Sequence, residues 1–127
     1  MSFEIINPDP PGRPNGWNNG MLGSAGGRVL FIAGQTAPKA GGLVAQWATA
    51  LAQVLAVVRA AGGAPGDIGR MTVYVTSKAD YLAHLKSLGE VHQKAMGKHY
   101  PAMALVEVSA LVDDAAVVEI EATAVIG

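Results

Sequence analysis

Cysteine is missing from this sequence of 127 residues. Its absence excludes a disulfide framework, a thiol nucleophile and any metal site built on thiolate ligands. The three histidines do not replace it, because none has an acidic residue or a second histidine at a convincing metal-ligand spacing. His84 and His92 lie eight positions apart, too far to share a metal on one helix, and we interpret them as residues of a helix surface. We therefore expect no metal site.

Charge is also scarce. Charged residues make up 15% of the chain, the formal net charge is −1, and lysine and arginine form no cluster. Nothing electrostatic therefore favours a nucleic acid as a partner. No segment reaches the roughly 18 consecutive apolar residues of a membrane helix, and no basic-then-apolar signal segment opens the chain. These absences predict a cytoplasmic protein without a nucleic-acid or membrane partner.

Hydrophobic residues, by contrast, make up 50% of the sequence. A chain of this length typically forms one domain, so we expect a single domain over residues 1–127. A small domain has a large surface for its volume, and so much apolar content suggests that another subunit buries part of that surface. The composition thus indicates an oligomer.

The last quarter of the chain alternates residue by residue, as β-strands with two different faces do. The linker 112–116 is short and polar, so the two strands are expected to form an antiparallel pair. One face of this pair is uniformly apolar and belongs to a core. The other face combines two apolar side chains with three carboxylates, namely Met103, Leu105, Glu107, Glu119 and Glu121.

Two interpretations of this mixed face remain open. The carboxylates form a charged edge that prevents sheets from aggregating, or they belong to a binding site or an interface, since exposed Met and Leu beside carboxylates are unusual on an ordinary solvated surface. Spacing alone favours the charged edge.

The middle of the chain predicts two helices between strands. Apolar residues at helical spacing predict a helix over 43–61, and Ser77 begins a capping-box-like segment that predicts a second helix ending near Met96. A hairpin is expected over 21–33 with a Gly-Gly turn, followed by Gly34, which marks either a bulge or the close approach of a ligand. These elements predict an α+β fold, in which one mixed sheet carries two helices on one face and leaves its other face free to oligomerise.

Five segments together resemble the Rid/YjgF family, which is also labelled endoribonuclease L-PSP. They are FIAGQ at 31–35, VYVT at 73–76, YPA at 100–102, VEV at 106–108 and VEIEA at 118–122. The resemblance covers nearly the whole chain. It implies a chorismate-mutase-like domain that assembles as a homotrimer, with small-molecule pockets between neighbouring subunits. Active members of the family hydrolyse imines and enamines to 2-keto acids and ammonia without a cofactor. In these members an arginine clamps the substrate carboxylate, and a glutamate handles water and protons.

The chain departs from the family pattern at several of these site positions. The family's arginine falls on Met103, which cannot donate to a carboxylate, and its serine falls on Ala33. Its asparagine falls on Gly89 and its loop tyrosine on Trp17, whereas the final-strand glutamate is retained as Glu119. The resemblance thus implies Glu119 as the catalytic residue and a pocket that is more apolar than usual. Its substrate-binding positions are Trp17, Ala33, Gly34, Gly89, Met103 and Leu105.

The sequence leaves open whether the protein is an enzyme. One hypothesis is a cofactor-independent hydrolase, a deaminase of imines or enamines, in which Glu119 is the general acid and base. The alternative is a non-catalytic trimer that binds a small molecule in the same inter-subunit cleft, or regulates through it. The RNA cleavage that the family label suggests is disfavoured, because the chain carries no basic patch.

Overall fold

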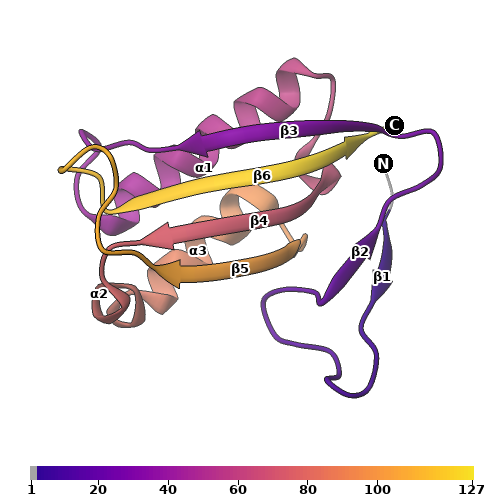
Figure 1. Cartoon of the computed structure of the whole chain (residues 1–127), viewed down its shortest axis with the longest axis horizontal. Coiled ribbons are helices and arrows are strands. Elements are labelled where there is room, and N and C mark those ends of the chain that lie inside the picture. Colours follow the sequence, from indigo (N-terminus) through magenta and orange to yellow (C-terminus); the bar gives the residue numbers. More distant parts are fainter. Residues whose placement is uncertain (1–2) are drawn as a thin grey trace.

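The computed structural model describes residues 3–127 and contains a mixed four-stranded sheet with its helices on one side (Figure 1). The strands follow the order β3-β6-β4-β5, in which β6 is antiparallel to both of its neighbours and β5 is parallel to β4. The strands are β3 (Arg28–Gln35), β4 (Ile68–Val75), β5 (Ala102–Glu107) and β6 (Val118–Ile126). The helices are α1 (Leu43–Ala60), α2 (Lys78–Ala83) and α3 (Leu85–Met96), with a short 3-10 turn at Pro65–Asp67.

Helix α1 packs its apolar face against the sheet and against α3. Leu51, Val54 and Val58 of this face are fully buried, and each such side chain contributes roughly 1.5–3 kcal/mol of burial free energy. The predicted first helix is therefore confirmed to within one residue of its end.

By length and composition alone, α1 could also cross a membrane. The expectation that no segment is long and apolar enough was therefore wrong. The core helix of a soluble protein passes the same test.

Two predicted strand pairings were wrong. The last two strands do not pair with each other, because β4 lies between β5 and β6. A crossover through α2 and α3 returns the chain beside β4, after which residues 108–117 carry it across to the centre of the sheet, where β6 finds a hydrogen-bonding partner on each side. The predicted hairpin over 21–33 is also absent, since β2 (Gly20–Leu22) pairs instead with β1 (Glu4–Ile6) in a separate two-stranded sheet.

The observed register separates residues that the sequence placed on one face. Leu105 lies opposite Val73, which in turn lies opposite the buried Ile120. Residues directly opposite each other in a sheet point to the same side, so Met103 and Leu105 lie on the side that the helices cover. Glu119 lies opposite Tyr74 on the other side. The predicted mixed face of Met103, Leu105 and the carboxylates therefore does not exist.

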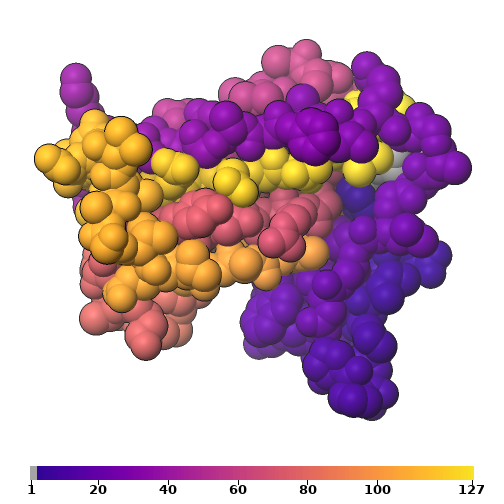
Figure 2. All heavy atoms as spheres, in the orientation of Figure 1, coloured from indigo at the N-terminus to yellow at the C-terminus, as the bar shows by residue number. Residues whose placement is uncertain are grey.

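The side of the sheet turned away from the helices is uncovered, and we call it the open face. No helix of residues 3–127 packs on it, and Figure 2 views the sheet from this side. Its exposed apolar side chains include Phe31, which is 79% exposed, together with Val29 and Val106. Glu119 and Glu121 lie among them on the central strand. The expected uncovered, partly apolar face is thus present, although its residues differ from those expected.

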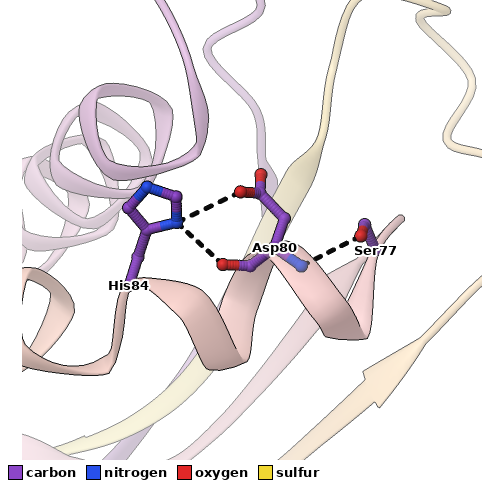
Figure 3. A network of polar contacts seen from close by, with 3 residues as sticks. All are labelled: Ser77, Asp80 and His84. Carbon is purple, nitrogen blue, oxygen red and sulfur yellow. Dashed lines mark hydrogen bonds and ion pairs between the residues drawn. The ribbon is translucent and has the colours of Figure 1, made fainter.

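The predicted second helix is interrupted at His84, which separates α2 from α3. The Ser77 hydroxyl caps α2 by accepting a hydrogen bond of 3.0 Å from the Asp80 amide, and Nδ1 of His84 lies 2.8 Å from the Asp80 carbonyl oxygen (Figure 3). The Glu107 carboxylate, from the end of β5, accepts a bond of 2.7 Å from the Lys78 amide. Glu107 is therefore a helix cap rather than a member of a carboxylate site.

Candidate functional site

A cavity of about 540 Å³ lies on the helix side of the sheet, between β5, the helices and the loop that joins β1 to β2. This volume is within the range of small-molecule sites. None of its lining residues is Asp, Glu, Lys or Arg, so the cavity is uncharged apart from one histidine. The lining residues are Asn15, Gly16, Trp17, Trp47, Tyr81, Leu85, Leu88, Gly89, His92, Tyr100, Met103 and Leu105.

Asn18 holds the loop that carries Trp17 against the edge of the sheet. Its amide donates to the Pro101 carbonyl oxygen at 3.2 Å, and its side-chain Nδ2 donates to the Tyr100 carbonyl oxygen at 2.7 Å. Its Oδ1 accepts a bond of 2.8 Å from the Asn7 side chain. These bonds cross from the N-terminal segment to residues next to β5, so they fix the Trp17 side of the cavity.

Two stacked ring pairs form much of the cavity wall. The ring centroids of Trp47 and Tyr81 are 6.0 Å apart with an interplanar angle of 17°, and those of His92 and Tyr100 are 5.1 Å apart with an angle of 7°. Such pairs add to the stability that burial alone gives and hold the rings in fixed orientations. The cavity is therefore preformed by aromatic side chains from several separate elements.

His92 is a polar group of this wall, and its hydrogen bond fixes which ring nitrogen carries the proton. Its Nε2 lies 2.8 Å from the carbonyl oxygen of His99. A carbonyl oxygen only accepts, so Nε2 carries the proton and Nδ1 keeps a free lone pair when the ring is neutral. Burial lowers the pKa of His92 below its ordinary value of 6.5, against the opposing effect of that hydrogen bond. The imidazole is thus neutral at pH 7.

Four of the seven site residues predicted from the sequence lie together in this cavity. They are Trp17, Gly89, Met103 and Leu105. Trp17 stands at the rim and is 45% exposed, whereas Met103 and Leu105 form the floor on β5. Nothing lies within 4 Å of the position that a Cβ at Gly89 would take, so this glycine leaves free space beside α3.

Ala33, Gly34 and Glu119 lie away from that cavity, on β3 and on the open face. The pairing of β3 with β6 shifts register between Ile32 and Gln35, so Gly34 lies in a bulge. A Cβ at Gly34 would collide with the carboxylate of Glu119, which explains why a residue without a side chain is present there. Of the two interpretations of Gly34, the bulge is what the structure contains. Within one chain, Glu119 does not reach Met103.

Tyr74 connects the two carboxylates of the open face. It lies opposite Glu119 on β4, and its hydroxyl interacts electrostatically with Glu121. Desolvation raises the pKa of the Tyr74 hydroxyl, and the negative charges of Glu121 and then Glu119 raise it further. The open face therefore carries a connected polar group surrounded by apolar side chains.

Residues 13–126 match the family model described as endoribonuclease L-PSP. The chain belongs to this family, that of the Rid/YjgF proteins. A RutC family protein from Pyrococcus horikoshii is 36% identical over 105 residues, which cover 77% of this chain and 79% of that protein. TdcF from Escherichia coli K12, provisionally named a reactive intermediate deaminase, is 35% identical over 108 residues, or 78% of this chain and 80% of that protein.

Solved structures agree with this assignment. A Rid family protein of unknown function, YyfB from Yersinia pestis, superposes with a TM-score of 0.83 at 32% identity, covering 99% of this chain and 100% of that one. A YjgF family member from Mycobacterium tuberculosis superposes with a TM-score of 0.67 at 31% identity over 88% of each chain. The α+β fold with one mixed sheet and its helices on one side is therefore confirmed for this Rid/YjgF chain.

Several cavity residues of this Rid/YjgF chain were missed from the sequence. His92 was interpreted as a surface residue, and Trp47, Tyr81 and Tyr100 were given no role in a site. His92 follows Leu88 by four positions and Leu85 by seven, which places all three on one helical face. That spacing was the available signal. Tyr100 could not be found in this way, because it reaches the cavity from the segment after α3.

No group of three or more His, Asp or Glu side chains within residues 3–127 is arranged to hold a metal ion. The histidines of this Rid/YjgF protein have other contacts. Nδ1 of His84 also lies 3.1 Å from the Asp80 carboxylate, and Nε2 of His99 lies 2.6 Å from the Ile68 carbonyl oxygen. The chemistry available in the cavity is therefore that of aromatic rings, tyrosine hydroxyls, the Asn15 amide, a thioether and one imidazole.

Proposed function

We propose that this chain is a Rid-type hydrolase of imines or enamines, with its active site formed between the subunits of a homotrimer. One observation carries the proposal: the residues that match the family's site lie on opposite sides of the same sheet. Trp17, Gly89 and Met103 line the cavity, whereas Glu119 lies on the open face. A second copy packed against the open face would bring its own cavity to Glu119. An apolar, uncovered sheet face supports such packing. A cytoplasmic location completes the proposal.

The reaction needs only water and an acid–base group. The Glu119 carboxylate accepts a proton from water as the water oxygen adds to the C=N carbon. Glu119 returns this proton to the nitrogen, which gives a carbinolamine. As the carbon–nitrogen bond then breaks, the hydroxyl proton passes through Glu119 to the nitrogen, which leaves as ammonia while the carbon becomes a carbonyl. A positioned acid–base group contributes typically 10²–10⁴-fold to such a step. Met103 offers no charge to a substrate carboxylate, so binding depends on the apolar and aromatic walls.

The test measures keto-acid formation from 2-imino acids generated in situ by an amino-acid oxidase. Wild type is compared with Glu119→Gln and Met103→Arg. We expect weak acceleration by wild type, a loss of about 100-fold or more in Glu119→Gln, and a gain of about tenfold or more in Met103→Arg through a new carboxylate contact. Full activity in Glu119→Gln would overturn the proposed role of Glu119.

A second candidate is a non-catalytic trimer that binds or senses a small molecule in the same cleft. The observation that favours it is the uncharged lining of the cavity, with Met103 where the family's arginine is expected. Under this alternative, ligands raise the thermal stability of wild type but no imine is hydrolysed. Met103→Arg would then gain activity that wild type lacks.

A further inference from the structure

We propose that the cavity binds an uncharged, planar aromatic molecule that donates an N–H or O–H hydrogen bond to Nδ1 of His92. The inference rests on the proposed function only in taking this cavity as the ligand site, and it adds the chemical class of the ligand. Three properties of the cavity carry it: its lack of charge, the shape and chemistry of its walls, and the hydrogen-bonding state of His92.

The lack of charge disfavours ionic ligands. None of this chain's residues that line the cavity is Asp, Glu, Lys or Arg, and the imidazole of His92 is neutral. A carboxylate entering this space would lose its hydration without gaining a counter-ion, and the Glu119 that the proposed homotrimer brings to the cavity would repel it. A neutral molecule does not incur that cost.

The walls suit a flat ring. Trp17, Trp47 and Tyr81 present aromatic surface from three separate elements, and aromatic rings attract other rings in offset or edge-to-face arrangements. The thioether of Met103 forms favourable contacts with ring edges. Gly89 leaves unfilled space beside these groups. The cavity of about 540 Å³ is therefore large enough for a small aromatic molecule and lined by the groups that bind one.

The imidazole of His92 supplies one directed polar contact. Its Nε2–H is already used by the His99 carbonyl oxygen, and its ring is held flat against Tyr100. Nδ1 has no hydrogen-bond partner among residues 3–127, and no buried side-chain nitrogen or oxygen in that range lacks one. Nδ1 is therefore accessible from outside the protein, and it can only accept. His84 differs, because its Nδ1 is already engaged by Asp80 outside the cavity.

The experiment measures dissociation constants by isothermal titration calorimetry with three probes. Indole is neutral and planar and has an N–H donor, 1-methylindole has nearly the same shape without the donor, and indole-3-acetate carries a negative charge. We expect wild type to bind indole roughly tenfold more tightly than 1-methylindole, as the loss of one hydrogen bond to a fixed acceptor implies. We expect indole-3-acetate to bind more weakly than either. Equal affinity for indole and 1-methylindole, or no binding of indole, would overturn the inference.

Variants locate the contact. His92→Phe keeps a ring against Tyr100 but removes the acceptor, so the ratio of the two indole affinities should fall to about one. The matched control His84→Phe changes a histidine outside the cavity and should keep the wild-type ratio. Gly89→Leu should fill the free space and abolish indole binding. An unchanged ratio in His92→Phe would show that another group accepts the bond. If His92→Phe does not fold, the comparison of probes on wild type still decides the matter.

The outcome is separable from the test of hydrolysis. Glu119→Gln should lose imine turnover, whereas His92→Phe should lose the preference for indole over 1-methylindole, so each variant tests one of the two proposals. Indole binding with the expected ratio but no turnover by wild type would refute the hydrolase and keep this inference. Turnover of charged 2-imino acids without any indole binding would refute this inference and keep the hydrolase.

Discussion

Gly34 and Glu119 are a pair of residues whose relation the sequence could not show. Each was recognised as a site candidate separately, Gly34 because it follows an apolar strand and Glu119 because it matches a family position. Their contact depends on β6 pairing with β3 and on the bulge between Ile32 and Gln35. A local pattern predicts which way a side chain points along its own strand. It does not predict which backbone from a distant segment lies under that side chain.

Replacing Gly34 with alanine should displace the Glu119 carboxylate, because the new Cβ would occupy its position. We expect little change in the free energy of unfolding, because a flexible, half-buried side chain can move aside, but at least a tenfold fall in imine turnover where wild type is active. Urea unfolding and the oxidase-coupled assay measure the two effects. Gly66→Ala is the matched control, since nothing lies within 4 Å of its added Cβ. A Gly34→Ala protein as active as wild type would contradict the contact.

At the scale of the helices, periodicity predicted α1 well because its apolar face is buried along the whole element. The same method joined α2 and α3 into one helix. Apolar residues continue at helical spacing through His84, so no local signal marks the break. The contacts at the break are those of His84 itself: its amide donates to the Tyr81 carbonyl oxygen at 3.1 Å, and its Nδ1 lies 2.8 Å from the Asp80 carbonyl oxygen.

Two glycines, one inside α3 and one directly after it, should respond in opposite directions when each is replaced with alanine. Gly89 lies inside the helix with free space around it, so Gly89→Ala should raise the free energy of unfolding by about 0.5–1 kcal/mol through helix propensity. Gly97 follows the helix with a φ of 65°, which strains any residue that has a Cβ, so Gly97→Ala should lower stability by about 1 kcal/mol. Urea unfolding of both variants checks the signs. A destabilised Gly89→Ala protein would indicate that the space beside α3 is not free.

At the scale of the whole molecule, the sequence predicted the class of fold and the existence of an uncovered face, but not the order of the strands. The alternation of residues 117–125 predicts two different faces whichever strands are its neighbours. The short linker 112–116 then suggested that β5 is the neighbour of β6, whereas β6 pairs with β3 and β4. That error also placed Met103 and Glu119 on one face, whereas the observed register places them on opposite sides of the sheet.

The open face provides the test of assembly. If copies pack through it, Phe31→Glu should abolish association, because it places a charge at a side chain that is 79% exposed in the single chain and buried in the proposed homotrimer. Sedimentation equilibrium should then give the mass of one chain, 13.0 kDa, rather than three times that mass for wild type. Val112→Glu, at a fully exposed loop position, is the control and should remain associated. A wild-type protein that sediments as a single chain would refute the homotrimer.

The central position of β6 also affects how the protein is made. This strand pairs with both β3 and β4, yet it comes last among the described strands, so the ribosome has already released both neighbours before their shared partner exists. Until residues 118–126 emerge, β3 and β4 have no strand between them, and α1 has only an incomplete sheet on which to pack. The sheet therefore forms only after residues 118–126 have been synthesised, and a nascent chain stalled before residue 118 should remain sensitive to proteases and available to chaperones.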